Sequence, residues 1–170
     1  MVTSTLCAAP TDAKRYALTS MNPIDQIDSH EYLYLTEIGE PEVNVLRIVI
    51  EEAKASRDEA RTLDVGSAKI SDLRPIVADE SCQRYEMVFG SYVAYCVRNE
   101  SYVVMDQSEV FTGRLFNVYS QSHLLDYVRA ATIASEDYPG KFIHYGINCL
   151  DHILDVISID EPAINILRRA

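Results

Sequence analysis

The chain has 170 residues, a length that suits one domain, and 48% of them are hydrophobic, which excludes a disordered protein. Its formal net charge is −11, with 15 basic against 26 acidic residues, so DNA and RNA are not expected ligands. No apolar run is long enough for a membrane span and the first residues show no leader pattern, so we expect a cytoplasmic protein without a membrane partner.

The N-terminal part of the chain predicts an arm followed by strands. We expect residues 1–30 to form an N-terminal arm of incomplete order and residues 31–170 to form a single domain. Within the arm, Asn22-Pro23 predicts a turn, because the residue before a proline avoids helical backbone. Alternating side chains then predict strands at 31–38 and 43–50.

The following stretch carries weaker signals. Residues 51–62 are mostly charged and predict an exposed helix or a loop. Residues 63–75 contain glycine, serine and proline and predict an irregular connection, with Ile70 and Leu73 expected to pack against the core.

Residues 85–98 give the strongest β signal in the chain. Two β-rich runs flank Gly90 and Ser91, which suit a two-residue type II′ turn. We therefore predict a hairpin in which Phe89 pairs with Tyr92.

Two helices complete the predicted fold. Ser122 is typical of a helix N-cap, and apolar residues recur at helical spacing after it. Near the end of the chain, a proline after two acidic residues predicts a short C-terminal helix at 160–167. We predict an α+β fold. It consists of a mostly antiparallel β-sheet of six to eight strands, arranged as a sandwich or half-barrel, with one principal covering helix at about residues 122–135.

Residues 142–159 concentrate the side chains that do chemistry. A turn near Leu150 and Asp151 predicts a hairpin in which Asn148 pairs with Ile153. In this register His144 and His152 lie on opposite faces. Asp155 is opposite Gly146 and diagonal to His144, close enough for an ion pair.

Two candidate catalytic pairs follow from this register. His144 and Asp155 are either a general acid–base pair or a satisfied polar contact, and the second interpretation is favoured. Cys149 and His152 form a thiolate–imidazolium candidate, but a hairpin tip supplies no oxyanion hole. We predict no metal site, because the register separates His144 from Cys149 and His152 and no fourth zinc ligand follows.

Missing motifs remove further classes of function. The sequence has no nucleotide-binding, zinc-protease, calcium-binding or serine-hydrolase motif, so no cofactor is predicted. The four cysteines are far apart in a chain large enough to fold without disulfides, so we expect free thiols.

The chain contains eleven tyrosines and no tryptophan. Tyr92, Tyr95 and Tyr145 are candidate contacts of a binding face, although packing at the edge of a core is the commoner role of tyrosine in strands. Acidic charge together with the missing catalytic motifs predicts a protein-binding or regulatory module of the immunity or antitoxin type, acting on a basic partner protein. The alternatives are an enzyme built on one of the two pairs and a structural homo-oligomer.

Overall fold

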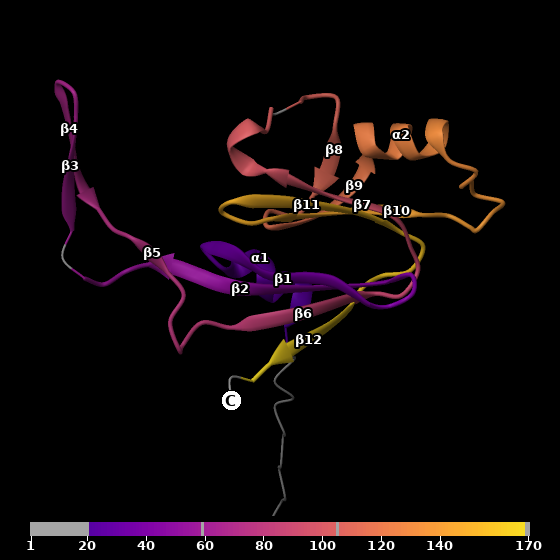
Figure 1. Cartoon of the computed structure of the whole chain (residues 1–170), viewed down its shortest axis with the longest axis horizontal. Coiled ribbons are helices and arrows are strands. Elements are labelled where there is room, and N and C mark those ends of the chain that lie inside the picture. Colours follow the sequence, from indigo (N-terminus) through magenta and orange to yellow (C-terminus); the bar gives the residue numbers. More distant parts are fainter. Residues whose placement is uncertain (1–20, 59, 105, 169–170) are drawn as a thin grey trace, which may run out of the picture.

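The computed structural model describes residues 21–58, 60–104 and 106–168. In these ranges the fold is α+β with mostly antiparallel sheets, as predicted (Figure 1). The described residues form twelve strands in three sheets, more than the six to eight predicted. None of the described helices is long and apolar enough to cross a membrane.

The first sheet has the order β1-β2-β6-β12, and the short strand β5 pairs with the end of β2. Its strands are β1 (Tyr32–Glu42), β2 (Val45–Ala55), β5 (Ile76–Val77), β6 (Arg84–Phe89) and β12 (Ala163–Leu167). The β1–β2 turn contains Asn44 at a φ of 61°, a left-handed conformation that asparagine tolerates better than most residues.

The second sheet has the order β7-β11-β10-β9-β8. Its strands are β7 (Tyr92–Asn99), β8 (Val110–Thr112), β9 (Phe116–Gln121), β10 (Ile143–Asn148) and β11 (His152–Ser158), and the 3-10 helix η1 (Glu100–Tyr102) follows β7. The predicted register of the late hairpin is confirmed, with Asn148 opposite Ile153 and Gly146 opposite Asp155.

The main core lies between these two sheets, which Figure 1 shows as two layers. Alternate residues of β2, β6, β10 and β11 point into it. Its members include Ile48, Tyr85, Met87 and Phe89 of the first sheet and Tyr145, Ile147, Leu154 and Val156 of the second. Helix α1 (Pro23–Ser29) adds Ile27, which is fully buried.

Helix α2 (His123–Ala131) covers the outer face of the second sheet, so the predicted principal helix is present but ends before residue 135. Its buried residues Leu125 and Val128 pack against Ile157 of β11 in a second, smaller cluster. The outer face of β10 and β11 is therefore partly covered by a helix and partly open to solvent.

The predicted hairpin of residues 85–98 is wrong. β6 pairs with β2 and β12, whereas β7 pairs with β11, so Gly90 and Ser91 carry the chain from one sheet to the other. The physical reason is that β6 gains a central position between β2 and β12, where Tyr85, Met87 and Phe89 are buried, and β7 gains pairing with β11 at the edge of the second sheet. A two-residue Gly-Ser turn fits either path.

The predicted C-terminal helix is also wrong, because residues 163–167 form β12. Ile164 pairs with Met87 of β6 and packs against the core, and a β-branched residue suits this half-buried position. At the other end of the chain, Asn22 accepts a hydrogen bond from the Ile24 N–H and Pro23 begins α1, so this proline starts a helix where a turn was predicted. Residues 1–20 of the predicted arm lie outside the described residues.

The stretch after β2 differs most from expectation. β3 (Arg61–Val65) and β4 (Ala68–Leu73) pair with each other as a third sheet in place of an irregular connection. We call residues 61–73 the projecting hairpin, because they extend away from both layers in Figure 1. Ile70 and Leu73 are 46% and 37% exposed instead of packed against the core.

Candidate functional site

The centre of the candidate site is the pair of His144 and Asp155 on the outer face of the β10–β11 hairpin. The Nε2 atom of His144 lies 3.1 Å from Oδ1 of Asp155. Each residue is 2% exposed. Since the two residues are diagonal neighbours across the confirmed register, the strand geometry itself brings them together.

Ser122 links this pair to helix α2. Its Oγ accepts a hydrogen bond from the Leu125 N–H at 3.1 Å, as a helix N-cap does, and lies 2.8 Å from Nδ1 of His144. The hydroxyl hydrogen is therefore available to Nδ1, and the Nε2–H of a neutral imidazole then donates to Asp155. In this arrangement every polar atom of the His144 ring has a partner.

Tyr119 fixes the orientation of the imidazole. The two rings are stacked, with centroids 4.1 Å apart and an interplanar angle of 14°. Gly146 makes this possible, because a Cβ atom at that position would lie 2.8 Å from Cε2 of Tyr119. The glycine is thus required by a close approach and not by its backbone angles.

Arg98 of β7 holds the other side of Asp155. Its Nε and Nη2 atoms donate to the two carboxylate oxygens at 2.7 and 3.1 Å, a bidentate contact. Burial works to raise the pKa of Asp155, but the hydrogen bonds from His144 and Arg98 outweigh it and hold this pKa below the ordinary value. Burial, with Asp155 adding to it, raises the pKa of the neighbouring Cys96 thiol to about 11.

A second imidazole–carboxylate pair lies at the N-terminus of α2. The Nε2 atom of His123 is 2.6 Å from Oδ2 of Asp106, and the His123 backbone N–H donates to Glu109 Oε1 at 3.0 Å. The hydrogen bonds from His123 and Ser108 lower the pKa of Asp106 to about 2, and the bond to Asp106 raises the pKa of His123. Unlike His144, His123 is exposed.

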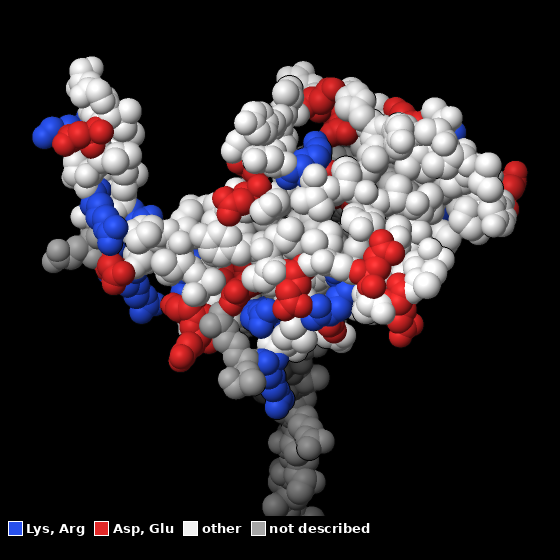
Figure 2. All heavy atoms as spheres, viewed as in Figure 1, with Lys and Arg blue, Asp and Glu red and all other residues white. Residues whose placement is uncertain are grey.

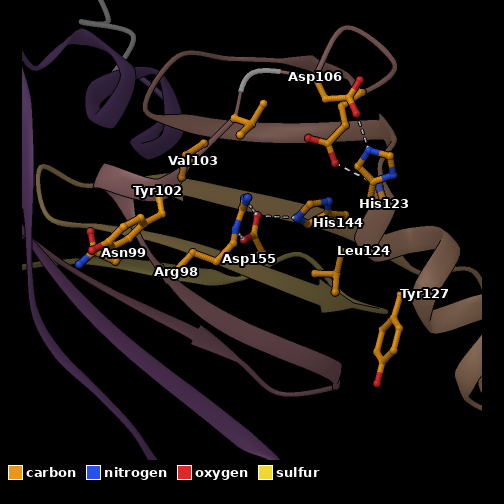
Figure 3. Close-up of a pocket in the computed structure, with 12 residues that line it drawn as sticks. Arg98, Asn99, Tyr102, Val103, Asp106, His123, Leu124, Tyr127, His144 and Asp155 are labelled. Atoms are coloured by element: carbon orange, nitrogen blue, oxygen red, sulfur yellow. Dashed lines mark hydrogen bonds and ion pairs between the residues drawn. The ribbon is translucent and has the colours of Figure 1, made fainter.

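One cavity of about 680 Å³, which we call the basin, is lined by the charged and titratable groups Arg98, Asp106, Glu109, His123, His144 and Asp155 (Figure 3). Arg98, His144 and Asp155 form its floor, and Asp106 and His123 lie at its wall. The exposed side chains of its rim are Tyr102 at 84%, Val104 at 82% and Tyr127 at 62%. The basin thus combines a polar floor, in which His144 and Asp155 are buried and Arg98 is 43% exposed, with a rim of exposed aromatic and aliphatic groups.

The predicted Cys149 and His152 pair has a different environment. Cys149 is 4% exposed within the core between the sheets, whereas His152 is exposed at the hairpin tip. Burial raises the pKa of the Cys149 thiol to about 12, which opposes formation of a nucleophilic thiolate. Among the described residues, no group of three or more His, Cys, Asp or Glu side chains is arranged to hold a metal ion.

The three tyrosines proposed as binding contacts lie away from the basin. Tyr145 is 2% exposed and packs between Phe89 and Phe116, so it is a core residue. Tyr92 and Tyr95 form an edge-to-face pair with ring centroids 5.3 Å apart, and the Tyr95 hydroxyl donates to Glu40. Tyr95 alone among the three retains substantial exposure, at 37%.

Sequence reasoning found His144, Asp155 and the cap residue Ser122, but it did not join Ser122 to His144. It also missed Arg98, because the pairing of β7 with β11 is not encoded in local spacing. The remaining residues of the basin come from the segment 99–109 and from α2, which meet only in the folded chain.

No protein-family model, curated protein or solved structure matches this chain.

Proposed function

We propose that this chain is a protein-binding module that holds a basic segment of a partner protein in the basin. The observation that carries the proposal is the combination of exposed tyrosines with an excess of carboxylates over cationic side chains around one cavity. A module of this kind would regulate or neutralise its partner by covering a basic surface, as expected for the immunity or antitoxin type.

The charge of the basin favours a cation. Arg98 is neutralised by its bidentate contact with Asp155. The wall of the basin has two acidic side chains, Asp106 and Glu109, and one histidine, His123, which supplies at most one positive charge. The basin is therefore negative at neutral pH, and the formal charge of −11 on the whole chain adds attraction at longer range. Acidic side chains are spread over the visible body of the molecule in Figure 2.

The rim supplies the contacts that a lysine or arginine side chain uses. Tyr102 and Tyr127 carry exposed aromatic rings, a kind of group that attracts cations, and Val104 and Leu124 offer apolar surface for the aliphatic stem. Aromatic residues of this kind are enriched at protein interfaces. The same groups would bind an acidic segment poorly, because its carboxylates would face Asp106 and Glu109.

A buried hydrogen-bond acceptor beside the basin favours a ligand that carries a hydrogen-bond donor. A side cavity of about 90 Å³ shares Arg98, Asp106 and Glu109 with the basin and reaches Asn117. Asn117 is 2% exposed, and its Oδ1 has no partner among the described residues. A guanidinium or ammonium group can satisfy such an acceptor, which buried polar atoms normally require.

The test is calorimetric titration of the full chain with synthetic peptides of equal length that carry basic, neutral or acidic side chains. We expect only the basic peptide to bind, with an affinity that falls as salt is added. The double variant Asp106→Asn with Glu109→Gln keeps both hydrogen-bond acceptors and should weaken binding roughly five- to tenfold.

The matched control is Glu80→Gln with Asp137→Asn, which makes the same change of charge at two exposed positions outside the basin. Its affinity should stay within about threefold of the original chain, since distant exposed charges are screened. Equal loss in both double variants would show that only net charge matters, and binding of the acidic peptide would overturn the proposal.

A second candidate function is acyl transfer by a serine nucleophile. The observation that favours it is the hydrogen-bonded series Ser122, His144 and Asp155 beneath the basin. Three features oppose it. Ser122 is 2% exposed, its Oγ already caps α2, and Arg98 neutralises the carboxylate that would stabilise an imidazolium.

A fluorophosphonate probe separates the two functions, because it labels an activated serine. We expect no labelling of the full chain. Labelling that disappeared in Ser122→Ala and persisted in a Ser120→Ala control would favour the enzyme over the binding module.

A further inference from the structure

The projecting hairpin has one apolar and one polar face. Leu63 lies opposite Ile70, and Val65 lies opposite Ala68, so these four side chains share a face. Asp64 and Lys69 are paired on the other face, where they form an ion pair at 3.7 Å.

A bulge extends the apolar face toward the base of the hairpin. The register shifts between the pairs Leu63–Ile70 and Arg61–Leu73, which brings Leu73 onto the same face as Ile70. The extra residue is Asp72, whose φ of 62° is unusual for a residue with a side chain. The unfavourable backbone at Asp72 therefore keeps Leu73 on the apolar face, because a regular strand would turn Leu73 to the polar side.

Within the described part of the chain, no other strand pairs with this hairpin and its apolar face remains open. Leu63, Val65, Ile70 and Leu73 are 54, 53, 46 and 37% exposed. A two-stranded hairpin is marginally stable unless something packs against it. Arg74 fixes only its base, through hydrogen bonds to the Ser56 and Asp58 carbonyls.

Charge indicates what covers this face. Residues 57–74 contain four basic and four acidic residues, so the segment is neutral and the rest of the chain carries the whole formal charge of −11. The projecting hairpin at the upper left of Figure 2 shows basic and acidic side chains close together. A basic protein is attracted to the acidic body rather than to the hairpin. A second copy is repelled by the body and meets least repulsion at the hairpin.

The shape of the face also suits a second copy. Its tip carries the small pair Val65 and Ala68, and its base carries the larger Leu73 and Arg61. In a two-fold antiparallel arrangement, the small tip of one copy lies over the large base of the other, and the contact is the same on both sides. Five residues of strand span about 17 Å, which keeps the two acidic bodies apart.

We propose that the projecting hairpin is a homodimerisation element whose apolar face packs against the same face of a second copy. The contact surface is small, so the dimer is weak and depends on protein concentration. It also depends on salt in a characteristic direction. Salt screens the repulsion between the acidic bodies and leaves the apolar contact intact, so association becomes stronger as salt is added.

Sedimentation equilibrium of the full chain over a range of concentrations tests the proposal. The double variant Leu63→Lys with Ile70→Lys places charge on the apolar face and should raise the dissociation constant at least roughly tenfold. The control Thr62→Lys with Ser71→Lys adds the same two charges on the polar side and should stay within about threefold of the original. Circular dichroism checks that both variants fold.

A chain that remains monomeric at the highest concentration and salt would overturn the proposal, as would equal dissociation in the two double variants. If the lysine variant does not fold, Leu63→Ser with Ile70→Ser replaces it with the same expected loss. Dimerisation that weakened with salt would also contradict the proposal, because it would indicate contact between oppositely charged surfaces.

Discussion

The basin and the projecting hairpin are two outer surfaces of one chain that are stabilised in different ways. The basin rests on a network in which the buried residues Ser122, His144 and Asp155 and the partly exposed Arg98 are joined by hydrogen bonds and by a bidentate ion pair. The projecting hairpin has strand pairing, one exposed ion pair and an open apolar face.

The difference shows how a surface is prepared for a ligand. In the basin, the buried network fixes the floor before anything binds, so little ordering is left to binding. In the projecting hairpin, order is completed by the partner itself, because an isolated hairpin gains most of its stability from packing. Salt should weaken binding of a basic segment in the basin and strengthen association of two acidic copies through the hairpin, so the two responses have opposite sign. Substitutions should change stability much more in the network beneath the basin than in the hairpin.

The largest contrast is expected from removal of one aspartate in each region. Asp155→Ala leaves the buried Nε2–H of His144 without a partner and releases Arg98, so it should lower the free energy of unfolding by roughly 3 kcal/mol. Asp64→Ala removes an ion pair whose partners are 70% and 77% exposed, and it should cost less than about 0.5 kcal/mol. Urea unfolding measures both values, and similar losses would break the comparison.

A smaller effect is expected at Gly146. The added Cβ of Gly146→Ala meets the Tyr119 ring and should displace it from His144, at a cost of about 1–3 kcal/mol. Gly39→Ala is the control, because nothing lies within 4 Å of a Cβ there, and it should stay within about 0.5 kcal/mol. The midpoints of thermal unfolding of the two variants measure these costs. An unchanged midpoint for Gly146→Ala would contradict the close packing of this site.

The pH dependence of stability sharpens the comparison further. Because hydrogen bonds lower the pKa of Asp155 in the folded chain, its contribution is present above the pKa of the unfolded chain and is lost as pH falls through the folded value. The stability advantage over Asp155→Asn should stay constant from neutral pH down to about 5 and shrink below about pH 4. An advantage that grew on acidification would mean that burial outweighs the hydrogen bonds.

The smallest effect is expected in amide hydrogen exchange. Amides of β10 and β11 should be well protected at every protein concentration, since they lie in the centre of a sheet. Amides of β3 and β4 should exchange faster and gain a few-fold protection as concentration rises and the dimer forms. Protection of the projecting hairpin that did not change with concentration would count against dimerisation.

The sequence by itself determined the features that depend on near neighbours. The pairing register of the β10–β11 hairpin follows from one turn and from the alternation of side chains along two short strands. This register makes His144 and Asp155 diagonal neighbours on one face. The N-cap at Ser122 was also visible, because a hydroxyl before an apolar helical pattern satisfies the first free amides. Net charge needs no structure at all.

Tertiary structure decided what depends on partners far away in the chain. A turn at Gly90 and Ser91 fits a hairpin and a crossing between sheets equally well, and only the burial available in each sheet chooses between them. That choice places Arg98 beside Asp155 and so completes the floor of the basin. The projecting hairpin was likewise hidden, because a bulge at Asp72 breaks the alternation by which a strand is recognised.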